Sequence, residues 1–168
     1  MVNAYKDAAD AAGWVVAGCD KLSNNFEESP LEHQVEDELL NDMLVRIPHA
    51  PNKFFLGGFS GGAERAYHLS GRRREKIAGI IAMGGWLGGE KYQKLPYCQH
   101  MAVAMGNGKA DEAAGSWVAK DGVVLRKRLC TTRLFPFDGG HQMPPRKIQD
   151  EVLVWLTKQT TDAGKPGR

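Results

Sequence analysis

A serine in a glycine-rich pentapeptide is the first residue of the chain that could perform chemistry. Ser60 is the central residue of the sequence GFSGG at 58–62, which matches the pattern G-x-S-x-G. In that pattern the serine occupies a tight turn between a strand and a helix, and the residues two before and two after it are small so that strand and helix can approach. A serine hydroxyl is a weak nucleophile unless a base lies beside it. The motif therefore predicts a nucleophile only if the fold brings a base and an acid to Ser60.

One histidine and one aspartate later in the chain are suited to these two tasks. His141 ends the sequence DGGH after the last predicted strand and is the candidate base. Asp111 ends the sequence GNGKAD after the preceding predicted strand and is the candidate acid that orients the imidazole. Each of the three residues follows the carboxyl end of a predicted strand. Their placement therefore predicts a Ser60–His141–Asp111 catalytic triad.

Several other residues could contribute to the same site. Glu112 and Asp138 are alternatives to Asp111, although Asp138 is more typical of a turn residue in the sequence Asp-Gly-Gly. The backbone N–H of Gly61, next to the serine, is expected to point at a developing oxyanion. Trp86 follows a predicted strand and could line a substrate pocket, but a place in the hydrophobic core fits it equally well.

The elements that must position these residues alternate between strand and helix. Five apolar runs predict strands, at Trp14–Cys19, Lys53–Phe59, Ile77–Met83, Met101–Met105 and Arg133–Phe137. This alternation is typical of an α/β fold with a mostly parallel sheet of about five strands and helices on both faces. In open α/β sheets ligands bind at the carboxyl ends of the strands, and the glycine-rich turns of this chain gather there.

Helical patterns fill the intervals between these strands. Ser29 followed by Pro30 and Glu32 is a capping-box pattern, and it predicts a helix that buries Val35, Leu39 and Met43 and ends before Pro48. The other helices are predicted over Asn3–Ala12, from Ser60 to Gly71, at 113–118 with a second piece at 123–130, and from Pro144 onward.

Composition and charge exclude several classes of protein. The 168 residues suit a single domain over 1–168. Because 22 basic residues oppose 20 acidic ones, we expect neither a nucleic acid nor an anionic membrane as partner. No apolar run approaches the ~20 residues of a membrane span and no signal-peptide pattern is present, so we expect a cytoplasmic protein with no membrane partner. The partner that we expect instead is a small-molecule substrate. Three scattered cysteines (Cys19, Cys98 and Cys130) indicate reduced thiols, and no histidine spacing indicates a metal site.

Four segments of the chain resemble the α/β-hydrolase superfamily. The resemblance is to small serine esterases of the dienelactone-hydrolase, phospholipase/carboxylesterase and polyester-depolymerase types. It lies in FFLGGFSGGAERAYHLS (54–70), IAGIIAMGGW (77–86), AMGNGKADEAA (104–114) and FPFDGGHQMPP (135–145). The chain order serine, aspartate, histidine is also that of the superfamily. The resemblance implies cleavage of carboxylic esters through an acyl-enzyme, with no cofactor and no metal.

The chain departs from these relatives on the N-terminal side of Ser60. The strand and His-Gly loop that supply a second oxyanion N–H in the superfamily have no counterpart, so the domain is expected to be N-terminally short. Gly84-Gly85 or the loop at 20–25 could supply a substitute donor. A further family strand, between Trp14–Cys19 and Lys53–Phe59, is also missing. We therefore expect these two strands to pair directly, or the exposed sheet edge to bind a partner chain, as in a homodimer.

Two other functions remain open on sequence alone. A chain that lacks an oxyanion loop could be a catalytically impaired hydrolase fold that acts as a binding or interaction module. A peptidase or a thioesterase would use the same three residues, because the chemistry is shared and the pocket decides the substrate.

Overall fold

A sheet of four parallel strands organises the computed structural model, which describes residues 2–19, 21–22, 29–50, 53–73, 77–95 and 100–162. The strands are β1 (Phe55–Phe59), β2 (Gly79–Met83), β3 (Ala102–Gly106) and β4 (Thr131–Leu134). They lie in the sheet in chain order, and Phe59 pairs with Met83, which pairs with Gly106. The carboxyl ends of β1, β2 and β3 are therefore level with one another at the same end of the sheet.

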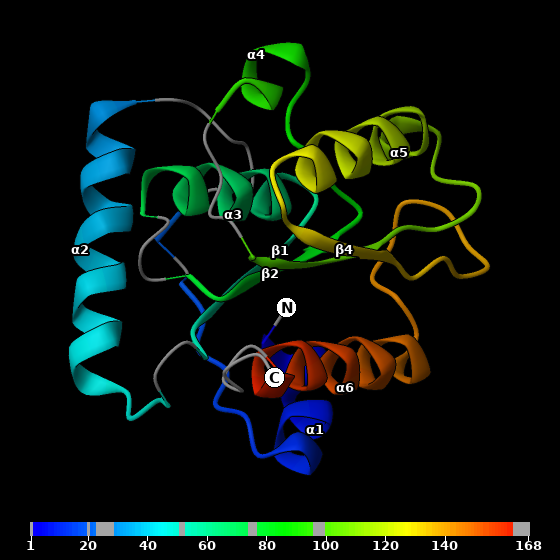
Figure 1. Cartoon of the computed structure of the whole chain (residues 1–168). Coiled ribbons are helices and arrows are strands. Elements are labelled where there is room, and N and C mark those ends of the chain that lie inside the picture. Colours follow the sequence, from blue (N-terminus) through cyan, green and yellow to red (C-terminus); the bar gives the residue numbers. More distant parts are fainter. Residues whose placement is uncertain are drawn as a thin grey trace.

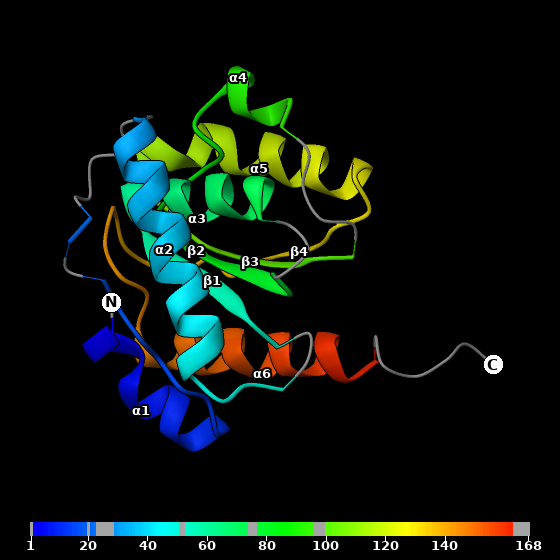
Figure 2. The same cartoon turned by 90° about the vertical axis from the view of Figure 1, so that its left-hand side faces the viewer.

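Helices cover both faces of this sheet, as predicted for an α/β fold. The helices are α1 (Val2–Ala12), α2 (Pro30–Arg46), α3 (Gly61–Arg72), α4 (Glu90–Gln93), α5 (Glu112–Lys127) and α6 (Arg146–Asp162). α3 and α5 lie on one face, and α1 and α6 lie on the other (Figure 1). α2 lies beside the edge of the sheet that β1 forms (Figure 2).

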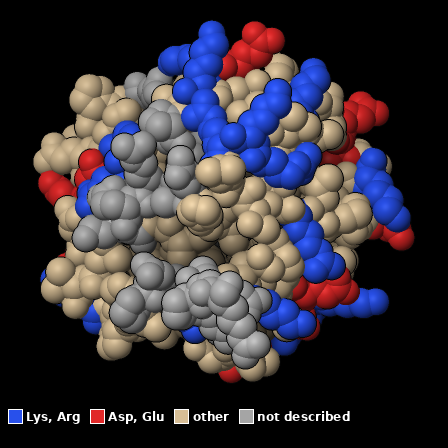
Figure 3. All heavy atoms as spheres, viewed as in Figure 1, with Lys and Arg blue, Asp and Glu red and all other residues tan. Residues whose placement is uncertain are grey.

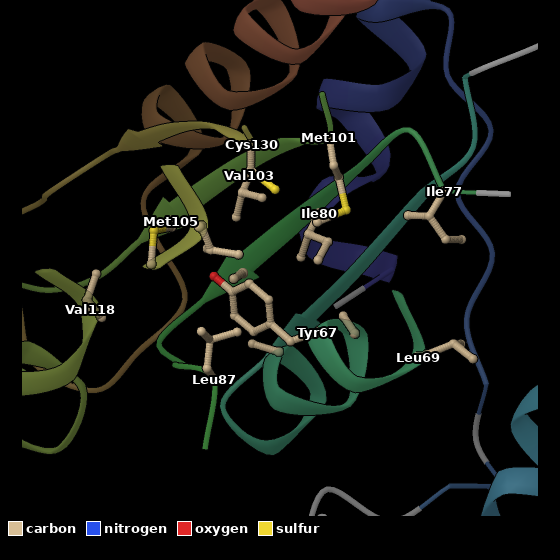
Figure 4. Close-up of a cluster of buried hydrophobic side chains, with 14 of the residues drawn as sticks. Tyr67, Leu69, Ile77, Ile80, Leu87, Met101, Val103, Met105, Val118 and Cys130 are labelled. Carbon is tan, nitrogen blue, oxygen red and sulfur yellow. The ribbon is translucent and has the colours of Figure 1, made fainter. Parts of the chain in front are cut away.

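The core consists of two hydrophobic clusters, one on each face of the sheet. The alternation of side chains along β2 separates them: Ile80 and Ala82 belong to the first cluster, Ile81 and Met83 to the second. The first cluster lies under α3 and α5 and surrounds the fully buried ring of Tyr67 (Figure 4). The second joins the sheet to α1 and α6. All five residues of β2 are buried, which is typical of a central strand in a parallel sheet.

The prediction of a strand at Trp14–Cys19 is wrong, and the sheet has four strands rather than five. Within the described ranges, this segment pairs with no strand. The Trp14 ring instead stacks on the ring of Phe55 with centroids 4.6 Å apart, and its indole N–H donates to Thr157 Oγ1 at 3.2 Å. Trp14 and Val16 both pack against the second cluster. The apolar run thus reflects side chains that pack on α6 and the sheet, not backbone pairing.

Most elements lie within two residues of their predicted bounds, and two differ by more. β4 spans Thr131–Leu134 instead of Arg133–Phe137; Pro136, within the predicted run, has no N–H to contribute to the ladder. α5 is one helix instead of two pieces, although the glycine at 122 lowers its intrinsic helix propensity. Val118 and Leu125, on either side of that glycine, are buried in the first cluster and hold the helix together.

α2 begins as predicted but buries a different face. Pro30 is the first helical residue, and Ser29 Oγ accepts a hydrogen bond from the N–H of Glu32 at 3.1 Å. The buried residues are Glu36 and Leu40, rather than the predicted Val35, Leu39 and Met43. The Glu36 carboxylate accepts hydrogen bonds from two arginines of α3, Arg65 and Arg72. Ion pairs with a neighbouring helix therefore decide which face of α2 turns inward.

Basic side chains gather over α4 and α5 on the face seen in Figure 3. Arg126 and Lys127 lie in the last turn of α5, where positive charge interacts favourably with the helix dipole. Next to them, the Arg128 guanidinium donates to the carbonyls of Gln93 and Leu95. These contacts tie α5 to the segment around α4, so part of this basic surface serves the fold. Cys130 is buried and its Sγ lies 4.0 Å from the carbonyl oxygen of Arg128, Cys19 is half-buried, and Cys98 lies outside the described residues.

Candidate active site

Ser60 lies in the turn that joins β1 to α3, and its backbone angles are ones that few residues other than glycine adopt. Its φ is 55° and its ψ is −123°, so the turn is strained. The N–H of Ser60 donates to the carbonyl of Met83 at 2.8 Å, and its carbonyl accepts from the N–H of Ala63 at 2.9 Å. A Cβ at Gly58 would lie 2.0 Å from the carbonyl carbon of Gly62, so the first glycine of the motif is required for strand and helix to approach.

The structure brings the three predicted residues into one series of hydrogen bonds. His141 Nε2 lies 2.9 Å from Ser60 Oγ, and His141 Nδ1 lies 2.9 Å from Asp111 Oδ2. The side chain of His141 is 40% exposed, whereas that of Asp111 is 1% exposed. A substrate can therefore reach the imidazole while the carboxylate behind it is shielded from water.

The Asp111 carboxylate is held by the helix that follows it. Asp111 is the N-cap residue of α5, and its Oδ1 accepts a hydrogen bond from the N–H of Ala114 at 3.2 Å. The two alternative acids lie elsewhere. Glu112 is exposed in the first turn of α5, and Asp138 forms an ion pair with Lys109. In the described part of the chain, Asp111 is the acid that contacts His141.

Backbone groups beside Ser60 are the candidates for binding an oxyanion. The N–H of Gly61 is at the amino end of α3, where the helix dipole favours negative charge, and it has no acceptor among the described residues. Gly84 is a poor second donor, because its N–H donates to the carbonyl of Gly106 at 2.8 Å. Gly85 lies against the serine turn, since a Cβ there would be 2.9 Å from the carbonyl oxygen of Ser60. Most of the loop at 20–25 lies outside the described residues.

A buried acid that the sequence did not reveal fixes the segment after β2. Trp86 in this segment is half-buried and packs on the first cluster. The next residue, Leu87, donates its N–H to Oδ2 of the fully buried Asp121 at 2.8 Å, and Gln93 Nε2 donates to Oδ1 at 2.8 Å. Burial raises the pKa of Asp121, and these two hydrogen bonds partly oppose the increase. Burial and the nearby Asp121 carboxylate also raise the pKa of Glu64, in the first turn of α3.

The described ranges of the chain lack two other kinds of feature. They contain no group of three or more His, Cys, Asp or Glu side chains placed to hold a metal ion. Nor do they contain a helix with the length and apolar character needed to cross a membrane.

Solved structures of several esterases and hydrolases share the fold of this chain. No protein-family model matches the chain. A carboxylesterase from Bacillus cereus is 17% identical with a TM-score of 0.64, and the match covers 77% of this chain and 60% of that one. Esterase PE8 is 26% identical with a TM-score of 0.63, covering 76% and 60%. A candidate hydrolase of the α/β superfamily from Xanthomonas campestris is 16% identical with a TM-score of 0.62, covering 94% and 88%.

The chain thus matches about 60% of the length of the first two esterases. Despite the low identities, the chain shares its α/β fold with these esterases and hydrolases.

Proposed function

We propose that the protein is a serine hydrolase that cleaves carboxylic esters through an acyl-enzyme. The observation that carries the proposal is the continuous hydrogen-bonded series Ser60–His141–Asp111 at the carboxyl ends of the strands. Each member has the environment its role needs: a strained turn for the serine, partial exposure for the histidine and burial for the aspartate. The esterases that share the fold support the same class of reaction.

In the proposed reaction, Ser60 Oγ attacks the ester carbonyl while His141 Nε2 accepts the hydroxyl proton. Asp111 accepts the Nδ1–H hydrogen bond, which orients the imidazole and stabilises its charged form. The tetrahedral intermediate carries a negative oxygen, to which the N–H of Gly61 donates. The intermediate collapses when the C–O bond breaks and His141 returns its proton to the leaving alcohol. A water molecule then repeats the sequence on the acyl-enzyme and releases the acid.

The segment after β2 is the proposed wall of the substrate site. Gly85 lies against the serine turn, and Trp86 follows it with its ring half-buried on the first cluster. We assign the remaining surface of the Trp86 ring to contact with substrate. The Asp121 carboxylate would keep this surface in place through its hydrogen bond to Leu87.

Hydrolysis of p-nitrophenyl acetate by the wild type and by Ser60→Ala tests the assignment. We expect the variant to lose at least about 10³-fold in kcat, because a serine hydrolase without its nucleophile retains little activity. Ser116→Ala, at an exposed serine of α5, is the matched control and should keep the wild-type rate. Equal rates for the wild type and Ser60→Ala would refute the role of Ser60.

A catalytically impaired binding module is the second candidate. It is favoured by one observation: the N–H of Gly84, a candidate second oxyanion donor, is already bonded to the carbonyl of Gly106. Loss of one such donor costs about 10²–10³ in kcat in a well-studied protease. A fluorophosphonate probe separates the two functions, because it labels an activated serine even when turnover is slow. Stoichiometric labelling of Ser60 supports the hydrolase, and no labelling supports the binding module. Thioester and peptide substrates then test the remaining acyl-transfer activities.

A further inference from the structure

The acid and the base of the proposed triad come from two separate loops that run side by side. Asp111 ends the loop between β3 and α5, and His141 lies in the loop between β4 and α6. Their hydrogen bond of 2.9 Å requires the two loops to keep a fixed separation. Productive catalytic geometry tolerates deviations of only ~0.5 Å. Some feature outside the triad must therefore set this separation.

Backbone hydrogen bonds join the two loops beyond the ends of their strands. The N–H of Lys109 donates to the carbonyl of Phe137 at 2.9 Å, and the N–H of Ala110 donates to the carbonyl of Gly139 at 2.9 Å. Gly108 and Phe137 form an isolated parallel bridge. These bonds continue the parallel pairing of β3 and β4 almost as far as the triad residues.

The close approach of the loops depends on a glycine. A Cβ at Gly108 would lie 2.3 Å from the carbonyl oxygen of Gly140 and 2.4 Å from that of Gly139. Both contacts are with the backbone immediately before His141, so no side-chain rotation could relieve them. Any residue other than glycine at 108 would push the loop that carries His141 away from Asp111.

An exposed ion pair joins the same loops on the outside. Lys109 Nζ lies 2.6 Å from Asp138 Oδ1, with side chains that are 63% and 91% exposed. The hydrogen bond from Lys109 and its positive charge lower the pKa of Asp138, so the pair persists into mildly acidic solution. Asp138, one of the alternative acids, thus contacts the other loop instead of His141.

We propose that Gly108 and the Lys109–Asp138 pair are positioning residues that set the distance between Asp111 and His141. None of them contacts Ser60 or His141 through a hydrogen bond or ion pair found in the structure, so they act through the loops. The proposal rests on the proposed function for its kinetic consequences. It also predicts a structural signature that is independent of turnover.

The first test is Gly108→Ala, with Gly115→Ala as its matched control. A Cβ at Gly115, in α5, meets nothing within 4 Å, so this variant should keep the wild-type kcat. We expect Gly108→Ala to lose about 10²-fold in kcat on p-nitrophenyl acetate with little change in KM, the usual result of a displacement near 1 Å. The far-downfield proton NMR resonance of the imidazole N–H that Asp111 accepts should also disappear. Unchanged kcat and an unchanged resonance would overturn the proposal.

The second test uses the ion pair, whose removal cannot create a clash. We expect Lys109→Ala and Asp138→Ala each to lower kcat only about 2–5-fold, because an exposed ion pair contributes little. The double variant should lose no more than either single variant, and the exchanged pair K109D/D138K should recover the wild-type rate. Lys6→Ala, which removes the exposed pair with Asp10 on α1, is the control.

These results separate the positioning proposal from the proposed function. If the wild type shows no esterase activity but its downfield resonance is lost in Gly108→Ala, positioning stands and the esterase assignment fails. If Gly108→Ala does not fold, the ion-pair series decides. Additive losses in the double variant, or no recovery in the exchanged pair, would overturn the role of Lys109 and Asp138.

Discussion

The two oxygens of the Asp111 carboxylate perform separate tasks. Oδ2 accepts from the His141 imidazole, and Oδ1 caps α5 by accepting from the N–H of Ala114. The cap ties the orientation of the carboxylate to the start of a helix that is packed into the core. The proposed acid is therefore aligned by the fold before any substrate binds.

Asp111→Asn should separate these two tasks. The amide oxygen can still cap α5, but the amide N–H₂ toward His141 favours the wrong imidazole tautomer. We expect kcat on p-nitrophenyl acetate to fall about 10⁴-fold, as in the comparable variant of a serine protease. Unfolding in urea should change by less than ~1 kcal/mol, because the cap remains. Asp111→Ala, which loses the cap as well, should be destabilised by about 1 kcal/mol. A rate near that of the wild type for Asp111→Asn would refute the role of the acid.

At the scale of single residues, the sequence predicted which three residues come together, but not which contacts keep them in position. The serine motif and the chain order of Asp111 and His141 are local patterns, and parallel strands bring their carboxyl ends together regardless of detail. The Lys109–Asp138 pair and the acceptor role of Asp121 depend on which loops and helices face each other. The residue spacing within a single element cannot predict contacts of this kind between elements.

Buried charge is a feature shared by the helices around the first cluster. Glu36 of α2 pairs with Arg65 and Arg72 of α3, and Asp121 of α5 accepts from Leu87 and Gln93. Burying a carboxylate is costly unless hydrogen bonds compensate for the lost water. Asp121 has such hydrogen bonds, yet burial still raises its pKa. Part of the cost of keeping it ionised therefore remains in the folded state.

The pH dependence of stability should reveal this cost. Because the pKa of Asp121 is higher in the folded than in the unfolded chain, the folded chain binds more protons between the two pKa values. The contribution of Asp121 to stability is then largest below the unfolded pKa of about 3.9 and falls as pH rises through the folded pKa.

Urea unfolding of the wild type and Asp121→Asn from acidic to neutral pH measures this dependence. We expect the wild type to lose stability relative to the variant as pH rises. Asp10→Asn, at an exposed carboxylate of α1, is the control. A difference between the wild type and Asp121→Asn that is constant with pH would contradict the expectation.

At the scale of the elements, the type of an element could be predicted where the sequence pattern was local. The predictions were wrong where contacts between elements decided the structure. The N-cap of α2 at Ser29 and the four strands of the sheet follow from side-chain chemistry and apolar runs. The segment Trp14–Cys19 has an apolar run like that of a strand, because its packing on the second cluster also requires apolar side chains. The buried face of α2 was missed since Glu36 turns inward only in the presence of two arginines from another helix.

At the scale of the whole molecule, β1 and β4 are the two edge strands of the sheet that the described residues form, and α2 lies beside the β1 edge (Figure 2). β1 pairs with β2 on one side, and on its other side the described part of the chain supplies no strand. The unpaired backbone groups of such an edge attract further strands. We propose that a second copy of the chain binds there and forms a homodimer.

Sedimentation velocity over a range of protein concentrations tests this assembly. We expect the mass to rise from monomer to dimer, together with greater protection of amides 55–59 from hydrogen exchange. A monomer at every concentration, with amides 55–59 exchanging at an unchanged rate, would refute the homodimer. Protection that appears with a dimer but spares these amides would place the interface elsewhere.

The sharing of one sheet face by α1 and α6 has a consequence for the order in which the chain can fold during synthesis. β1, α3 and β2 form a unit whose neighbours in space are also neighbours in sequence, so the first cluster can begin to assemble early. The second cluster needs α6, the last helix described, and until it emerges Ile81, Ala104 and Phe135 lack their cover. Nascent chains that stop before residue 146 would expose this apolar sheet face, and such a face is prone to aggregation. The helix that follows His141 thus closes the second cluster, and we expect the loop that carries His141 to be fixed only after α6 has been synthesised.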